Sequence, residues 1–170
     1  HQTSQEVTAF VSAVGTGGTL AGTSLFLKQM NRSIRVACAD PYGAAMWSWF
    51  KNGNLEDSDG DSIAEGIGQG RVTRNLEDIE IDTAFRIEDQ TALTIVYQLI
   101  RDEGLFLGLS SGINIAGAVQ LALEGGPGQV ITTILCDSGA RYMSKIFNPD
   151  WLNQQSLDPG LPIESVLKRP

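Results

Sequence analysis

The chain has 170 residues, of which 42% are hydrophobic and 19% are charged, so we expect one compact domain and no long disordered tail. Twenty acidic residues against twelve basic ones give a formal net charge of −8, which disfavours nucleic acid and anionic membranes as partners. The single histidine is His1, which excludes catalytic sites of the Ser-His-Asp and Cys-His classes and metal sites built on histidine.

The chain also lacks the marks of a membrane or secreted protein. No apolar run approaches the roughly 20 residues of a membrane-spanning helix, and the N-terminus has no basic-then-apolar signal pattern. Cys38 and Cys136 lie far apart within apolar segments, which favours two reduced thiols in the core. We therefore expect a cytoplasmic protein with both cysteines buried.

The beginning of the chain predicts a strand, a helix and a second strand. The segment 8–14 is short and rich in residues that favour strands. Residues 19–30 carry side chains at helical spacing, and residues 34–39 form another apolar run. Because a helical crossover of this length joins parallel strands, we expect a βαβ unit with parallel strands.

The rest of the chain continues this alternation. The expected elements are an aromatic helix at 44–50, a long polar connection at 52–75, a strand at 79–87, helices at 91–101 and 112–123, a strand at 129–135 and a short helix at 140–147. The 129–135 segment, QVITTIL, is β-branched at nearly every position and is the clearest strand. After Pro149, the proline and glycine content predicts surface coil.

These elements predict an α/β fold, with an open, mostly parallel sheet and helices on both faces in three layers. We expect the α/β domain to cover residues 1–150 and a C-terminal tail to cover 151–170. The chain opens directly onto a strand expected to be buried, so we expect a piece of a larger protein.

A glycine-rich loop, Gly15-Thr16-Gly17-Gly18-Thr19, separates the first strand from the first helix. Glycines let the backbone approach a ligand closely, and the free N–H groups and dipole at a helix start favour an anion. The two threonine hydroxyls add donors. The loop therefore predicts a phosphate site, and a tight turn without a ligand is the alternative.

Two nucleotide-binding patterns fit this loop poorly. The P-loop needs a lysine after its last glycine, whereas Thr23 follows Gly22. The dinucleotide pattern G-x-G-x-x-G has Leu20 at its third glycine, although Asp40 ends the next strand about where a ribose-binding acid would stand. A Rossmann-type domain therefore stays open, as does a turn-forming role for Asp40 before Pro41.

Three other small-residue segments are candidates for contact with a ligand. Ligands of open α/β sheets bind outside the carboxyl ends of the strands, where CDSG (136–139) places Ser138. The alternate glycines of EGIGQG (65–70) permit backbone contact with a flat group. SSG (110–112) precedes a helix. For Ser138 and for the two serines of SSG, a helix cap is the alternative.

Together these segments resemble the cysteine synthase branch of the pyridoxal-phosphate (PLP) enzymes of fold type II, which also includes cystathionine β-synthase. The similar stretches, in order between about Val11 and Leu152, are VSAVGTGGTLAG, ADPYGAAM, EGIGQGRVTRNLE, LGLSSGINIAGA and CDSGARYMSKIFNPDWL. The Rossmann alternative explains only the first of them.

The resemblance implies roles for particular positions. Those that match the loop holding the cofactor phosphate are Gly15, Thr16, Gly17, Gly18 and Thr19. Ser138 matches the serine that hydrogen-bonds the pyridine nitrogen, and a neutral hydroxyl there leaves the ring a weaker electron sink, which suits β-elimination. Gly66 and Ser110, with Ser111 beside it, match positions on the substrate side.

The same resemblance implies a missing part. The family's Schiff-base lysine belongs to its N-terminal half, and the lysines present, Lys28, Lys51, Lys145 and Lys168, lie outside the matching context. The resemblance therefore implies the C-terminal half of a two-domain fold type II enzyme, without a catalytic residue of its own and inactive alone. Its expected partners are the missing N-terminal half, a second copy in a homodimer and a small amino-acid substrate.

For the intact protein, the resemblance implies PLP-dependent β-replacement on an activated serine, most simply the synthesis of cysteine from O-acetylserine and sulfide. Condensation of serine with homocysteine, as in cystathionine β-synthase, is the alternative within the same fold. From other classes, a Rossmann-type nucleotide-binding domain and a non-catalytic binding or scaffold domain stay as alternatives.

Overall fold

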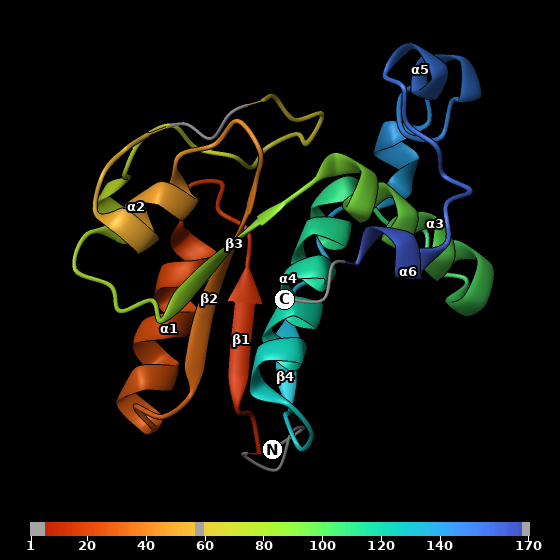
Figure 1. Ribbon diagram of the computed structural model, residues 1–170. Coiled ribbons are helices and arrows are strands. Elements are labelled where there is room, and N and C mark those ends of the chain that lie inside the picture. Colours follow the sequence, from red (N-terminus) through yellow and green to blue (C-terminus); the bar gives the residue numbers. More distant parts are fainter. Residues whose placement is uncertain (1–5, 57–59, 168–170) are drawn as a thin grey trace.

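The computed structural model describes residues 6–56 and 60–167, so His1 and Lys168 lie outside the described residues. Its strands are β1 (Ala9–Ser12), β2 (Arg35–Pro41), β3 (Thr83–Ile87) and β4 (Ile131–Thr133). They form one sheet in the order β3-β2-β1-β4, and each neighbouring pair is parallel (Figure 1). The predicted α/β fold with a parallel sheet is confirmed, as is the parallel βαβ unit.

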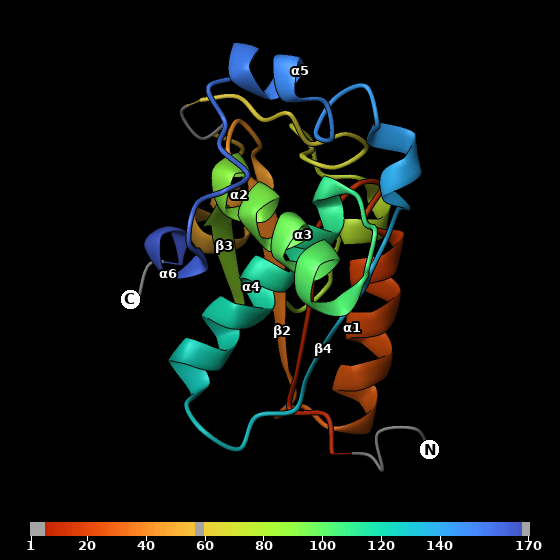
Figure 2. The same cartoon turned by 90° about the vertical axis from the view of Figure 1, so that its right-hand side faces the viewer.

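Helices cover both faces of this sheet. The helices of the chain are α1 (Gly18–Met30), α2 (Met46–Asn52), α3 (Asp89–Glu103), α4 (Leu109–Gly125), α5 (Pro149–Gln154) and α6 (Ile163–Val166), with 3₁₀ turns η1 (Arg74–Leu76) and η2 (Gly139–Tyr142). On one face lie α1 and α2, and on the other lies α4, which touches all four strands and carries α3 on its outer side (Figure 2). The sheet is therefore the middle of three layers.

The inner strands send alternate side chains into two separate cores. In β1, Ala9 and Val11 pack toward α3 and α4, whereas Phe10 packs among residues of α1 and α2. Successive side chains of a strand point to opposite faces, so a strand covered on both sides has an almost continuous apolar sequence. That pattern is why β1 and β2 were predictable.

Predictions for the C-terminal part of the sheet were partly wrong. The strand expected at 129–135 is limited to β4, and Val130, Ile134 and Leu135 beside it are exposed. Within the described residues, β4 pairs with β1 alone and ends the sheet. A strand at an edge has pairing on one side only, so β-branched composition does not extend it.

Helical predictions after β4 also need correction. The helix expected at 140–147 is only the 3₁₀ turn η2, and the coil expected after Pro149 contains α5 and α6. Asn148 starts α5 by accepting from the N–H groups of Asp150 and Trp151, with Pro149 in the first turn. This is a helix-start signal, and the predicted boundary at residue 150 falls within α5.

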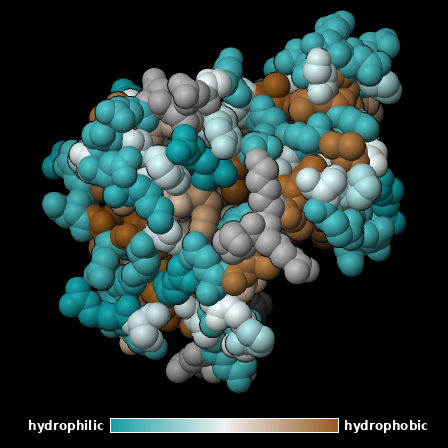
Figure 3. Space-filling view, viewed as in Figure 1, coloured by the Kyte–Doolittle hydropathy of each residue, from teal (hydrophilic) through white to brown (hydrophobic). Residues whose placement is uncertain are grey.

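The surface agrees with the acidic composition. In the face drawn in Figure 3, hydrophilic side chains cover most of the area and apolar ones show as separate patches. None of the helices within residues 6–56 and 60–167 combines the length and apolar character that crossing a membrane requires.

Candidate functional site

At the carboxyl edge of the sheet, the loop after β1 leads into the bare N-terminus of α1. Gly17 occupies the N-cap position with φ of +83°, a left-handed conformation that glycine adopts readily. Among the described residues, no side chain caps α1, and no acidic residue lies in its first turn. The first N–H groups of a helix have no acceptor within the helix, so here they are available to an anion.

The loop is held from behind by the segment around η1. The carbonyl oxygen of Thr16 accepts from Thr73 Oγ1 at 2.8 Å and from Asn75 Nδ2 at 3.0 Å. Leu76 packs so closely that a Cβ on Gly17 would lie 2.6 Å from its side chain. Thr73 and Asn75 were not expected from the sequence, where they are ordinary polar residues of a long connection.

The EGIGQG segment lies directly against the same loop. A Cβ on Gly15 would lie 2.6 Å from the carbonyl oxygen of Gly66, and Gly68 N donates to Val14 O at 3.1 Å. Two segments more than fifty residues apart are thus in backbone contact, which requires glycine at position 15. The long polar connection has a structural purpose, since it brings the second glycine segment to the first.

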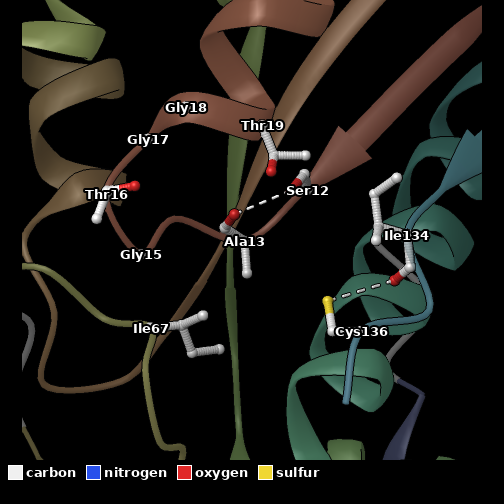
Figure 4. A pocket seen from close by; sticks show the side chains of 10 residues that line it. All are labelled: Ser12, Ala13, Gly15, Thr16, Gly17, Gly18, Thr19, Ile67, Ile134 and Cys136. Carbon is white, nitrogen blue, oxygen red and sulfur yellow. Dashed lines mark hydrogen bonds between the residues drawn. The ribbon is translucent and has the colours of Figure 1, made fainter.

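A cavity of about 180 Å³ opens in front of the loop (Figure 4). Its lining residues, all uncharged, are Ser12, Ala13, Gly15, Thr16, Gly17, Gly18, Thr19, Ile67, Ile134 and Cys136. Figure 4 shows Ile67 close to the loop, and Ile134 and Cys136 across the cavity on the segment that follows β4. Backbone amides and hydroxyls are therefore the polar groups that a ligand meets.

The two cysteines differ from each other. Cys38 is buried in the core, as predicted, where desolvation and then the charge of Asp40 raise the pKa of its thiol. Cys136 is exposed and lines the cavity, so its predicted burial is wrong. The reason is that β4 stops at Thr133, and the chain beyond leaves the sheet at the cavity wall.

Ser138 lies two residues beyond Cys136 and is exposed. Its Oγ accepts from Ala140 N at 3.3 Å at the start of η2, which is the capping role that the sequence left open. The segment is fixed by two backbone hydrogen bonds to the loop before α4, Gly108 N to Asp137 O and Gly139 N to Phe106 O. Ser138 is not among the cavity-lining residues. Its contact with a pyridine nitrogen stays a prediction.

The serines that begin α4 are buried and do not line the cavity. Ser111 Oγ accepts from Cys136 N at 2.9 Å, so it supports the cavity wall from behind. The substrate-side role of Ser110 stays a prediction, as does that of Gly66. Asn114, one helical turn after Ser111, is also buried and was not predicted to belong to the site. An amide side chain in an alanine-rich helix was the signal that could have indicated it.

Asp40 is the last residue but one of β2 and is completely buried beneath α2. Its Oδ2 accepts from Trp47 N at 2.8 Å, and its Oδ1 has no partner among the described residues. Desolvation raises the pKa of this carboxyl to about 6, against the lowering effect of backbone hydrogen bonds from Trp47 and Met46. A carboxyl buried there holds a helix start and does not reach the cavity, which removes the main support for the Rossmann alternative.

The three lysines within the described residues have partners of their own. Lys28 pairs with Asp82 at 2.6 Å, Lys51 donates to Thr83 Oγ1 at 2.8 Å, and Lys145 pairs with Glu65 at 2.5 Å. None of these three lysines lines the cavity. Within the described part of the chain, no lysine is placed to bond with a ligand there.

Comparisons with known proteins agree with this geometry. A model of the family described as "Pyridoxal-phosphate dependent enzyme" matches residues 1–137. Cysteine synthase 1 of Neurospora crassa is 41% identical over 165 residues, which are 95% of this chain and 44% of that protein. Cysteine synthase 2 of Schizosaccharomyces pombe is 39% identical over 174 residues, with the same 95% and 44% coverage.

Two solved structures share the fold. The O-acetylserine dependent cystathionine beta-synthase from Helicobacter pylori gives a TM-score of 0.72 at 32% identity, over 82% of this chain and 43% of that one. O-Acetyl Serine Sulfhydrylase isoform 3 from Entamoeba histolytica gives 0.76 at 29% identity, over 98% and 46%. The chain thus spans less than half the length of the curated relatives that it matches.

Proposed function

Because the chain belongs to the pyridoxal-phosphate dependent enzyme family, we propose that its glycine loop holds the phosphate of PLP in a β-replacement enzyme. The observation that carries the proposal is the bare N-terminus of α1, which opens on the cavity lined by residues 15–19. Backbone donors and helix polarity suit a phosphate group there.

The chemical groups that line the cavity suit this cofactor. A phosphate needs several donors and no nearby carboxylate, and the lining offers glycine amides and the hydroxyls of Thr16 and Thr19 without any formal charge. A flat ring needs apolar walls, which Ile67 and Ile134 supply. Together these groups fit a small aromatic phosphate monoester.

When bound, PLP supplies an electron sink for carbanion chemistry on an amino acid. The residues of this chain would bind and orient it. The α1 amides would hold the phosphate, Ile67 and Ile134 would shield the ring from water, and the Ser138 hydroxyl would hydrogen-bond the pyridine nitrogen. Rigid holding of this kind keeps reacting groups aligned and lowers the entropic part of the barrier.

We assign the reaction as replacement of the acetoxy group of O-acetylserine by sulfide, which yields cysteine and acetate. Two relatives named cysteine synthase, each similar over 95% of this chain, support the assignment. A second candidate is the same replacement with homocysteine as the nucleophile. The structure from Helicobacter pylori, whose title names an O-acetylserine dependent cystathionine beta-synthase, favours that candidate.

The partner that we propose is a polypeptide region equivalent to the part of the relatives that this chain does not cover. The open edge at β4 supports this, because Val130, Ile134 and Leu135 expose apolar side chains beside a strand paired on one side. Unpaired edges and exposed apolar side chains favour further association. We also propose a homodimer and a cytoplasmic location, to be tested by sedimentation and by cell fractionation.

The test uses the purified full-length protein that contains this chain. We expect visible absorbance from bound PLP, and cysteine formation from O-acetylserine with sulfide that exceeds cystathionine formation with homocysteine. Ser138→Ala should lower kcat about tenfold or more, since removing the partner of a polar ring atom costs about 1–3 kcal/mol. Ser144→Ala, on an exposed neighbour, is the control. Absence of PLP from the wild-type protein would refute the proposal.

A further inference from the structure

We propose that Asn114 and Ser111, on one side of α4, are positioning residues that set the distance between the two walls of the cofactor cavity. One wall is the loop that follows β1, and the other is the segment that follows β4. The inference rests on the proposed function, because it takes the cavity to be the PLP site.

Asn114 joins the two walls through a single side-chain amide. Its Oδ1 accepts from Ala13 N at 2.7 Å, at the end of β1. Its Nδ2 donates to Ile134 O at 2.8 Å and lies 3.4 Å from Cys136 Sγ, both beyond the end of β4. All three partners line the cavity, whereas Asn114 itself is fully buried behind it.

Ser111 supports the second wall alone. Its buried Oγ accepts from Cys136 N at 2.9 Å, one helical turn before Asn114. The two side chains therefore hold Ile134 O and Cys136 N, on either side of Leu135, in a segment with no strand structure of its own. That segment leads directly to Ser138.

These contacts begin where sheet pairing stops. The paired register of β1 and β4 ends at Val11 and Thr133. Beyond those residues the two segments are no longer paired and the cavity opens between them, so backbone pairing does not fix the distance between them. An amide side chain suits this position because it accepts from one wall and donates to the other, which neither a carboxylate nor an aliphatic group can do.

The arrangement has a consequence that depends on ligand size. Inorganic phosphate touches the glycine loop only, whereas a ligand with both phosphate and ring spans the cavity toward the Cys136 wall. Loosening that wall should therefore weaken the larger ligand selectively. A role confined to stability would weaken both ligands to the same extent, or neither.

The experiment uses the full-length protein freed of PLP and two calorimetric probes. One is inorganic phosphate, and the other is pyridoxine 5′-phosphate, which has the ring and the phosphate but no aldehyde to bond with a lysine. For Ser111→Ala and Asn114→Ala, we expect pyridoxine 5′-phosphate to bind about tenfold more weakly, and phosphate to change less than about twofold.

Ser24→Ala is the matched control for Ser111→Ala. Ser24 is equally buried and loses one hydrogen bond to the backbone, 2.8 Å to Glu80 O, but it lies outside the cavity lining. We expect a similar loss of thermal stability for the two serine variants and an altered affinity only for Ser111→Ala. Should Asn114→Ala fail to fold, the serine pair alone decides the question.

The outcomes separate the two proposals. If the wild-type protein binds both probes and the Ser111 and Asn114 variants weaken them equally, or match Ser24→Ala, the positioning role is refuted and the PLP site stands. If the wild-type protein binds neither probe, the PLP site itself is refuted, and the positioning role with it. Selective weakening of pyridoxine 5′-phosphate supports both.

Discussion

The parallel strands β1 and β4 are neighbours in the sheet. The one whose sequence is less β-branched, β1, is the more buried. All four residues of β1 are buried, whereas the three of β4 are partly exposed, although the segment around β4 is the more β-branched. β1 has a strand on each side, and β4 is paired with β1 alone within the described residues. Strand propensity therefore does not decide burial, which depends on position in the sheet and on the cover of each face.

The largest expected effect is on the free energy of unfolding, when a buried side chain of β1 is removed. Phe10→Ala should lower the free energy of unfolding by about 3–5 kcal/mol, because it removes a buried ring. Ile131→Ala on β4 should cost only about 1 kcal/mol, since its side chain is already partly exposed. Urea unfolding measures both. Equal losses in the full-length protein would mean that another segment covers the β4 edge.

Asp40, on the inner strand β2, makes the free energy of unfolding depend on pH. The pKa of Asp40 is about 6 in the folded protein and 3.8 ordinarily, so the folded state binds this proton more tightly. Its contribution to stability is therefore fully present below about pH 4 and is lost as pH rises through 6. The loss amounts to at most about 3 kcal/mol, and Asp40→Asn should remove this slope.

Unfolding free energies of the wild-type protein and Asp40→Asn, measured at intervals from pH 4 to pH 7, test this. The difference between the two proteins is the quantity of interest, because other carboxyl groups titrate in both. A difference that stays constant over this range would contradict a raised pKa for Asp40.

At the end of β1, Gly15→Ala tests the contact between the two glycine segments. Its Cβ would lie 2.6 Å from a backbone oxygen, so the loop must move, and we expect PLP affinity to fall about tenfold or more. Gly22→Ala in α1 is the control, because an added Cβ there would have no described atom within 4 Å apart from the neighbouring backbone of its own helix. It should stabilise α1 by up to about 1 kcal/mol. Unchanged PLP binding by Gly15→Ala would contradict the close approach.

The smallest effect is expected at the ion pair of Glu65 with Lys145, which follows β4 in the chain. Both side chains are about half exposed, at 47% and 48%, so solvent screens their attraction. A double-mutant cycle with alanine at each position should give a coupling energy below about 1 kcal/mol that falls with added salt. A coupling of several kcal/mol would show that this pair is better shielded than its exposure indicates.

The parts of the fold that were predictable have local causes. The β1–α1–β2 unit follows from apolar runs punctuated by glycine. The alternate glycines of EGIGQG predicted close backbone contact with a flat ligand, and the structure also places them against the glycine loop. The exposure of Cys136 and the extent of β4 depend on which edge of the sheet is uncovered. No periodicity in the sequence indicates which edge this is.

The residues that hold the site together were harder to find than those that line it. Thr73 and Asn75 look like any polar residues of a connection, and their hydrogen bonds to Thr16 exist only after the chain folds back. Asn114 stands one turn after Ser111, so helical spacing gave a clue to their common direction. Which strand ends they meet is a tertiary property.

The sheet order has a consequence for how the molecule is made. The glycine loop and Asn114 are about a hundred residues apart, and the Cys136 wall is translated later still. At about 5–20 residues per second, a ribosome needs on the order of ten seconds between the first wall and the last. During that time the nascent chain has only the first wall, so a ligand that spans the cavity can touch both walls only after the last has emerged.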